Sequence, residues 1–463
     1  MKKTFRFLSM AALLVVGAIM TGCSNEDNID NPQQPANNDN IVTLSATVSL
    51  DGGAQTRAIT PSTGVKTFEA TNEIAVIYKN TTGTGETVKA ESGTLTLSAD
   101  GTKATFTVTL TNPATNSAVR YIYPATMAKD VATDATITDD AATIDYTRLL
   151  SNQNGNLTNL GTNFDLAVFD GSLSGTDLPA SASLTNPLTI CALTLKDGGS
   201  DITSSVNSLN VSDGTNTYHV TPSGLSEIYV AMKPVASQKI AFTAATGSKT
   251  YFKTTASAQT LAASTIYNSI TVSMVELARG SVICSDGSVY ASKDAATSAS
   301  KTPVAMIAYL GSDNGEPAPY NHGLALALSD ANSGSNCNWS TSTSDAGHTK
   351  QTDSNNFTSE SGLQYNATHN SDTYPAFKAA IANNSTAAPT GCSAWFLASG
   401  YQWTKMFASD AGGLKTLAGL KSGYYWSSSE ANAWNAWTFD FGLGYWYDAD
   451  KENVNHVRSC LAF

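Results

Sequence analysis

The sequence predicts a mostly β fold, in which a β-sandwich region of two lobes is followed by an α+β domain. Charged residues make up only 14% of the 463 residues, and Ser, Thr, Asn, Ala and Gly are abundant, which favours strands and polar loops over long amphipathic helices. Short apolar segments recur between turns rich in Gly, Asn, Asp and Pro, as in sandwiches. The composition changes after residue 276, because all seven Trp residues lie beyond it. A chain of this length has room for two or three domains.

The chain opens with an export signal. Two lysines precede a short apolar run at 7–20, which is too short for a transmembrane helix and ends at Cys23. Residues 1–22 are therefore expected to be a lipoprotein signal peptide, and the small residues before Cys23 resemble a bacterial lipobox, so Cys23 is expected to carry the lipid. Residues 24–27 resemble the acidic export tag of surface lipoproteins in Bacteroides-type bacteria. Residues 23–40 are too polar to bury a core and predict a flexible tether.

The first predicted strand, residues 41–50, alternates apolar residues with small polar ones, which is the pattern of a half-buried strand. Residues 51–53 break the pattern, and Arg57 follows in a polar loop that an Arg-specific protease could cut before Ala58. A cut there would separate the strand from the domain, exposing backbone groups and apolar pockets that a strand of another chain could fill. The alternative is an ordinary first strand followed by a loop with one exposed Arg.

Residues 41–275 resemble the fimbrillin family of Bacteroides-type pilins, with Ala75 where the family usually has Gly. The resemblance implies a lipidated precursor that is cut after Arg57 and joined to its neighbours by strand exchange, in which the C-terminal strand region of one subunit fills the vacated groove of the next. The stretches that carry the resemblance are Thr56-Arg57-Ala58, 67–78, 226–231 and 260–267.

Strands are expected throughout this region, in lobes of about 41–163 and 164–275. Residues 131–163 are polar and irregular and predict a long surface loop between the lobes. Cys191 lies in a buried-strand pattern and is expected to be a packed thiol. The expected strands after the first are 74–78, 93–98, 104–110, 119–123, 165–169, 188–195, 208–211, 218–220, 228–232, 239–243, 251–254 and 267–275.

Residues 276–463 predict an α+β domain. Helical signals occur at 373–381 and at 399–407, where Trp403, Met406 and Phe407 share one face. Short strands surround these helices. They are expected at 281–283, 304–309, 324–329, 425–428, 436–441, 444–448 and 457–463.

This second region resembles a family of bacterial surface domains with a C-type-lectin-like fold, the major paralogous domain of Fibrobacter and Bacteroides. The most specific part of the resemblance is Trp426-Ser427-Ser428-Ser429-Glu430. Ala398 stands where the family usually has Pro. The other stretches that carry the resemblance are 395–400, 423–425, 436–437, Lys451, 457–458 and 462–463.

Four of the six Cys residues lie in this region, and exported Cys residues usually pair. Four Cys residues permit three connectivities. We favour Cys284 with Cys460, which would join the first strand of the domain to its last, and Cys337 with Cys392. The sparse His residues show no spacing that suggests a nucleophilic Cys.

The aromatic run near the C-terminus is compatible with a core role and with a binding role. Trp437, Phe439 and Phe441 would share one face of a strand and suit burial. Trp434 and Trp446 flank turns and could present flat faces to sugar rings, with Asn432, Asn435 and Asp448 beside them. For each aromatic residue of this run, a place in the core is the alternative.

Composition and spacing argue against several function classes. The net charge is −12 and no Lys/Arg cluster lies beyond the first six residues, so nucleic-acid binding is not expected. No His, Cys and Asp grouping has zinc-site spacing, and the calcium motif of sugar-binding C-type lectins is missing, so neither a metal nor a cofactor is predicted. An enzyme that makes formylglycine shares the lectin-like fold, but the paired reactive Cys that it needs is not visible.

The main hypothesis is therefore a non-enzymatic surface lipoprotein of the outer membrane, a pilin subunit at the tip of a fimbrium. Its partners would be other pilin subunits, bound by strand exchange, and a host or microbial glycan or protein, bound by the C-terminal domain. The tip position is expected because 267–275 runs directly into that domain and is not free to donate. The alternative is a monomeric surface glycan-binding lipoprotein that does not polymerise.

Overall fold

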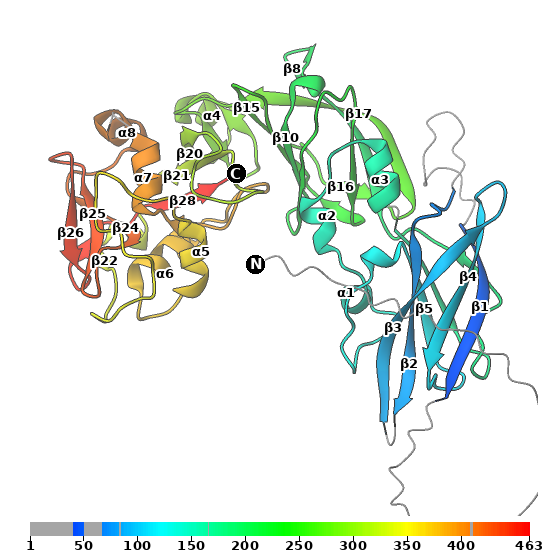
Figure 1. Cartoon of the computed structure of the whole chain (residues 1–463). Helices are drawn as coiled ribbons and strands as arrows, with labels where there is room; N and C mark the ends of the chain where they lie inside the picture. Colours follow the sequence, from blue (N-terminus) through cyan, green and yellow to red (C-terminus); the bar gives the residue numbers. More distant parts are fainter. Residues whose placement is uncertain (1–39, 51–66, 83–84, 165, 408–410) are drawn as a thin grey trace, which may run out of the picture. The chain divides into compact units, whose positions relative to one another are not determined.

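The computed structural model describes residues 40–50, 67–82, 85–164, 166–407 and 411–463. The chain divides into residues 1–39 and one compact unit, Asn40–Phe463. The predicted signal peptide, Cys23, Arg57 and Ala58 lie outside the described residues. The described part is mostly β, as predicted (Figure 1). Within these ranges, no helix is both long and apolar enough to cross a membrane.

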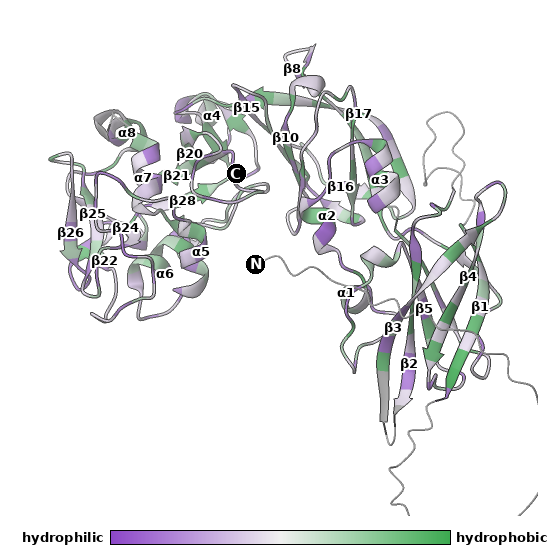
Figure 2. Ribbon diagram, in the orientation of Figure 1, coloured by the Kyte–Doolittle hydropathy of each residue, from purple (hydrophilic) through white to green (hydrophobic). Residues whose placement is uncertain are grey.

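The first sheet has seven strands in the order β6-β5-β2-β3-β4-β1-β7. Alternation explains its strands: in β4 the residues Ala104, Phe106, Val108 and Leu110 are buried, and those between them are exposed. Hydrophobic residues recur in the same way along β1 (Figure 2). The bounds are β1 Ile41–Leu50, β2 Glu73–Thr82, β3 Gly85–Leu97, β4 Lys103–Thr111, β5 Ala118–Tyr123, β6 Ala167–Ser172 and β7 Ser181–Leu184.

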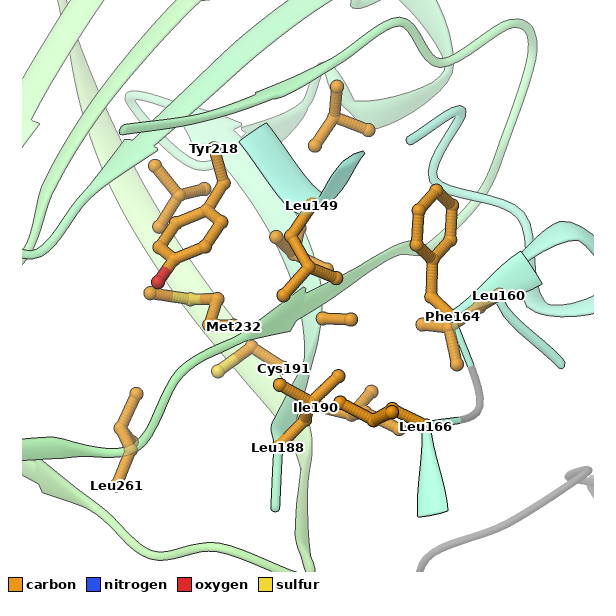
Figure 3. Packing of buried hydrophobic residues seen from close by; sticks show 14 of the residues in the cluster. Leu149, Leu160, Phe164, Leu166, Leu188, Ile190, Cys191, Tyr218, Met232 and Leu261 are labelled. Atoms are coloured by element: carbon orange, nitrogen blue, oxygen red, sulfur yellow. The ribbon is translucent and has the colours of Figure 1, made fainter. Parts of the chain in front are cut away.

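The second sheet follows the order β11-β10-β14-β15-β17-β8-β12, with β9 paired to β8 and a separate β13–β16 hairpin. It packs against the largest apolar cluster, which includes Ile190, Tyr218 and Met232 (Figure 3) and extends to Ile77 and Ile122 of the first sheet. The bounds are β8 Thr189–Asp197, β9 Ser200–Asp201, β10 Ser208–Ser212, β11 Thr217–Val220, β12 Ile228–Met232, β13 Val235–Gln238, β14 Ala241–Ala245, β15 Thr250–Thr254, β16 Gln259–Leu261 and β17 Thr265–Glu276.

The prediction of a long surface loop at 131–163 is wrong. This segment forms three short helices, α1 Asp140–Thr143, α2 Thr147–Ser151 and α3 Leu157–Asn163. Its buried apolar residues, among them Leu149 and Leu160, belong to the same cluster as Ile190 (Figure 3). They are too widely spaced to show a helical period in the sequence. The first sheet also includes β6 and β7, which follow residue 163. The chain therefore passes from the first sheet to the second after β7.

The C-terminal region combines a six-stranded sheet, β19-β18-β20-β21-β28-β23, with a three-stranded sheet, β24-β25-β26, and the pair β22–β27. The bounds are β18 Val282–Cys284, β19 Val289–Tyr290, β20 Pro303–Leu310, β21 Gly323–Ala327, β22 Cys337–Asn338, β23 Phe396–Leu397, β24 Tyr424–Glu430, β25 Asn435–Asp440, β26 Tyr445–Asp450, β27 Val454–Asn455 and β28 Ser459–Ala462; the helices are α4 Lys293–Ser298, α5 Gly362–Thr368, α6 Pro375–Ala382, α7 Gly400–Phe407 and α8 Ala411–Ala418.

Both predicted helices of this region are confirmed as α6 and α7. In α7 the residues Trp403, Met406 and Phe407 are buried, as their spacing predicted. Three further helices, α4, α5 and α8, were not predicted, because their segments are short and rich in Ala, Gly, Ser and Thr.

The predicted disulfides are not formed, since all five Cys residues in the described ranges are free thiols. Cys284 on β18 and Cys460 on β28 are separated by β20 and β21, so three strand spacings of roughly 4.8 Å put them about 14 Å apart. A disulfide needs Cα atoms within about 7 Å. Cys337 and Cys392 contact different apolar clusters. Cys191 is a packed thiol as predicted, and burial raises its pKa to about 12.

Candidate functional site

Strand β1 lies inside the first sheet but is enclosed on both edges only at its end. It pairs antiparallel with β4 from Ile41 to Ser49, and parallel with β7 only from Thr47 to Leu50. Its first half therefore has a single strand neighbour among the described residues. Exposure follows the same gradient, from 64% at Ile41 to fully buried at Val48. The end that is held most firmly is the end that leads toward Arg57.

The inner face of β1 is bound by apolar contacts. Ala46, Val48 and Leu50 are buried in the cluster that contains Phe106 and Leu184. If β1 left, this face of the cluster would open as a groove beside an unpaired edge of β4, which is the form of site that accepts another strand.

The outer face of β1 is polar and weakly held. Its hydroxyl groups meet those of β4, with Ser45 Oγ 2.8 Å from Thr107 Oγ1 and Thr43 Oγ1 3.3 Å from Thr109 Oγ1. These exposed contacts add little stability, because water can replace them. Retention of β1 thus depends mainly on its buried apolar residues.

Strand β17 contains the segment 267–275, which is not expected to donate, and its two strand neighbours pair with different parts of it. It runs parallel to β8 along most of its length and pairs with β15 at its end. Directly after it, the buried Leu277 donates its N–H to Thr250 O at 2.8 Å. The chain then enters β18 and the C-terminal region.

The C-terminal region is joined to the second sheet by buried polar contacts. His322 Nε2 lies 2.8 Å from Ser208 Oγ, and His322 Nδ1 lies 3.2 Å from Asn210 Nδ2. Because Asn210 Nδ2 is a donor, Nδ1 of His322 accepts and Nε2–H donates, so the ring is neutral. Burial and the neighbouring His219 lower the pKa of His322 to about 4. Lys239 Nζ adds a hydrogen bond to Asp286 O at 2.9 Å.

The Trp-Ser-Ser-Ser-Glu stretch is a buried structural element rather than a surface site. Trp426 Nε1 donates to Cys337 O at 2.9 Å and Ser427 Oγ donates to Trp437 O at 2.8 Å. Glu430 is fully buried and is paired with both Lys350 and Lys451. Burial lowers the pKa of Lys451, and the contact with Glu430 opposes this effect.

Arg458 has a similar structural role. Its Nε donates to Asp330 Oδ1 at 2.9 Å, and its Nη1 donates to Ala327 O at 2.8 Å and to Ala418 O at 3.0 Å. It therefore satisfies a carbonyl at the C-terminus of α8 and ties this helix to β21.

Four of the five predicted ligand-binding residues gather at the β24–β25 turn and on the neighbouring strand β26. Asn432 Oδ1 accepts the N–H groups of Trp434 and Asn435 at 2.9 and 3.0 Å, and this turn leaves the Trp434 side chain 68% exposed. Asn435 Nδ2 lies 3.3 Å from Asp448 Oδ2. These four side chains form a small exposed group with one free aromatic face.

Trp446, the fifth predicted residue, lies apart from this group. Its ring is partly buried against Phe357 and Phe439, at centroid distances of 4.6 and 5.3 Å. The core alternative therefore holds for Trp446.

Two exposed tyrosines and the partly exposed Tyr424 were not predicted as binding residues. Tyr445 and Tyr447 lie on the face of β26 opposite Trp446, with 43% and 48% exposure, and the Tyr424 ring lies 5.9 Å from that of Tyr447. The two-residue spacing of Tyr445 and Tyr447 is a sequence signal that could have placed them together.

A polar cavity of about 540 Å³ lies beside α5 in the same region. Its lining includes His348, His369, Glu360 and Tyr365. These groups bind one another: the His348 ring stacks on Tyr365 at 3.7 Å, and Tyr365 Oη donates to Glu360 Oε1 at 3.0 Å. Burial lowers the pKa of His348 to about 3 and raises that of Glu360. Among the described residues, no group of three or more His, Cys, Asp or Glu side chains is arranged to hold a metal ion.

Comparison with known proteins gives structural matches only. No protein-family model matches the chain, and no curated relative matches it in sequence. One similar solved structure is a fimbrial protein from Bacteroides ovatus, which is 14% identical, with 91% of this chain and 99% of that protein covered and a TM-score of 0.34. Another is the minor pilin of Streptococcus agalactiae, which is 11% identical, with 51% and 97% covered and a TM-score of 0.22. Matches at these scores do not establish a shared fold.

Proposed function

We infer that this chain is a surface pilin subunit whose strand β1 is released by cleavage after Arg57 and replaced by a strand of a neighbouring subunit. The observation that carries the proposal is the seating of β1, which binds through one buried apolar face and has a second strand neighbour only from Thr47 to Leu50. The sequence resemblance of residues 41–275 to fimbrillins supports the same scheme. Lipidation at Cys23 would hold the precursor at the outer membrane before assembly.

The subunit accepts a strand but does not give one. Donation by β17 would require breaking its pairing with both β8 and β15 and freeing the buried Leu277. The contacts of His322 with the second sheet oppose this release. A subunit that only accepts ends the polymer on one side, so we place it at the fimbrial tip.

The C-terminal region, which resembles a C-type-lectin-like domain, supplies the adhesive site and no catalysis. The exposed group of Trp434, Asn435 and Asp448 offers an aromatic face with amide and carboxylate groups beside it, a combination that suits a sugar ring. The ligand is a host or microbial surface glycan, or a protein.

A monomeric glycan-binding lipoprotein is the competing function. The two functions differ in the fate of residues 23–57, which a pilin loses and a plain lipoprotein keeps. Arg57→Lys should block an Arg-specific protease while preserving the charge, and Arg148→Lys, elsewhere in the chain, is the matched control. A pilin should then accumulate as an uncut precursor and disappear from purified fimbriae, whereas the control should assemble normally. Equal assembly of both variants would refute the proposal.

Position in the polymer has its own test. Immunogold labelling against the C-terminal region should mark the ends of fimbriae. Regular labelling along the shafts would exclude the tip assignment without excluding strand exchange.

A further inference from the structure

Strands β15 and β17 separate in the middle of the second sheet. They pair only at Tyr251 with Glu276 and at Phe252 with Val275. Beyond these two pairs, a cavity of about 330 Å³ lies between Lys253 on β15 and residues 270–273 on β17. The sheet is therefore open beside its own core.

The walls of this cavity are mostly apolar, although Thr255, Gln259, Thr271 and Ser273 also line it. The buried side chains that line it come mainly from β8, β10, β12, β14, β16 and β17, and include Cys191, Met232, Phe242 and Leu261. Figure 3 shows Cys191, Met232 and Leu261 in this part of the core. Such a lining favours a hydrocarbon ligand and disfavours a sugar or nucleotide, which would lose hydrogen bonds to water.

The side chain of Lys253 supplies a positive charge at the edge of the cavity. Lys253 pairs with Phe242 across β14 and β15, so both side chains point to the same face of the sheet. Tyr251, two residues earlier, is buried on that face. Lys253 is partly exposed, and within the described ranges it has neither an ion pair nor a side-chain hydrogen bond. Lys249 on the same strand, by contrast, is bound to Glu276 at 2.6 Å.

We propose that this cavity binds a single-chain fatty acid, with its hydrocarbon chain among the apolar walls and its carboxylate at the Lys253 ammonium. The unpaired positive charge selects an anionic head group over a neutral or cationic one. A volume near the lower end of the usual range for small-molecule sites, about 300–1,000 Å³, leaves no room for a lipid with two chains.

An extended peptide is disfavoured as the occupant. It would have to pair with the open edge of β17, but the register of β17 shifts between Tyr267 and Ile270, and Ser269 has a left-handed φ of 58°. Such an irregularity interrupts strand addition. The site also lies on the second sheet and does not involve β1, so it is independent of the proposed polymerisation.

The test is calorimetric titration of the full chain with decanoate, decanol and decylamine. Decanoate should bind most tightly and decylamine should not bind. Lys253→Met should weaken decanoate binding by about tenfold and leave decanol binding unchanged, because it removes the charge and keeps the stem. Lys103→Met, at an exposed position of the first sheet, is the matched control and should bind like the original chain.

Filling the cavity gives a second measurement. Leu261→Trp should abolish binding of both decanoate and decanol, and Ile270→Trp, at a partly buried position, serves the same purpose if the first variant does not fold. The proposal is overturned if decanoate fails to bind, if decylamine binds as well as decanoate, if Lys253→Met has no effect, or if a cavity-filling variant that folds still binds.

Discussion

Val48→Ala should loosen β1 after cleavage. Val48 is fully buried in the first core, and its replacement removes two carbon atoms and leaves a void. At about 0.8 kcal/mol for each buried methylene, with a cavity term added, the loss is about 2 kcal/mol. If the cleaved strand is held only by non-covalent contacts, its dissociation constant should rise roughly 30-fold. Thr47→Ala, on the exposed face of the same strand, should change it by no more than about 0.5 kcal/mol.

The assay uses purified protein cut after Arg57 by an Arg-specific protease. A fluorophore on the released N-terminal fragment reports its dissociation after dilution, and the dissociation rates of the two variants are compared with that of the original chain. Equal rates for Val48→Ala and Thr47→Ala would refute the reasoning that the buried face retains β1.

Three further outcomes follow from the contacts described above. His322 is neutral in the folded chain, where its pKa is lowered from 6.5 to about 4, so the unfolded chain takes up a proton first as the pH falls. The free energy of unfolding should therefore fall by roughly 3 kcal/mol between about pH 6.5 and pH 4. In a denaturant titration, His322→Asn should show a smaller decline. Trp434→Ala should weaken glycan-array binding and leave Tm unchanged, whereas Trp446→Ala should cost about 3 kcal/mol of stability, and the reverse pattern would exchange their roles. Reducing agent should leave Tm unchanged because the described thiols are free, and a lowered Tm would show that they pair.

Strands with clear alternation could be predicted from the sequence. The segments of β1, β4 and α7 show their periods plainly, because one face of each is buried and the other is not. The helices α1 to α3 could not be predicted, since each has only one buried residue. Their burial depends on contacts with strands such as β8 and β12, which are distant in the chain.

The candidate site was predicted in part. The turn formed by Asn432 to Asn435 follows from local chemistry, because an Asn side chain readily accepts N–H groups two and three residues ahead. The burial of Trp446 cannot be predicted from local chemistry, since it depends on contact with Phe357, which lies on a loop that is distant in the sequence. The disulfide prediction failed for the same reason. Cys284 and Cys460 are separated by the order of the strands in the sheet, which cannot be predicted from the spacing of residues along the chain.

The most direct test of strand release is the N-terminus of the subunit within assembled fimbriae. Fimbriae purified from the cell surface are dissociated, and this chain is examined by N-terminal sequencing and intact mass. Removal of β1 by cleavage after Arg57 predicts a chain that begins at Ala58 and carries no lipid. A chain that begins at a lipid-modified Cys23 and retains residues 41–50 would contradict the release of β1.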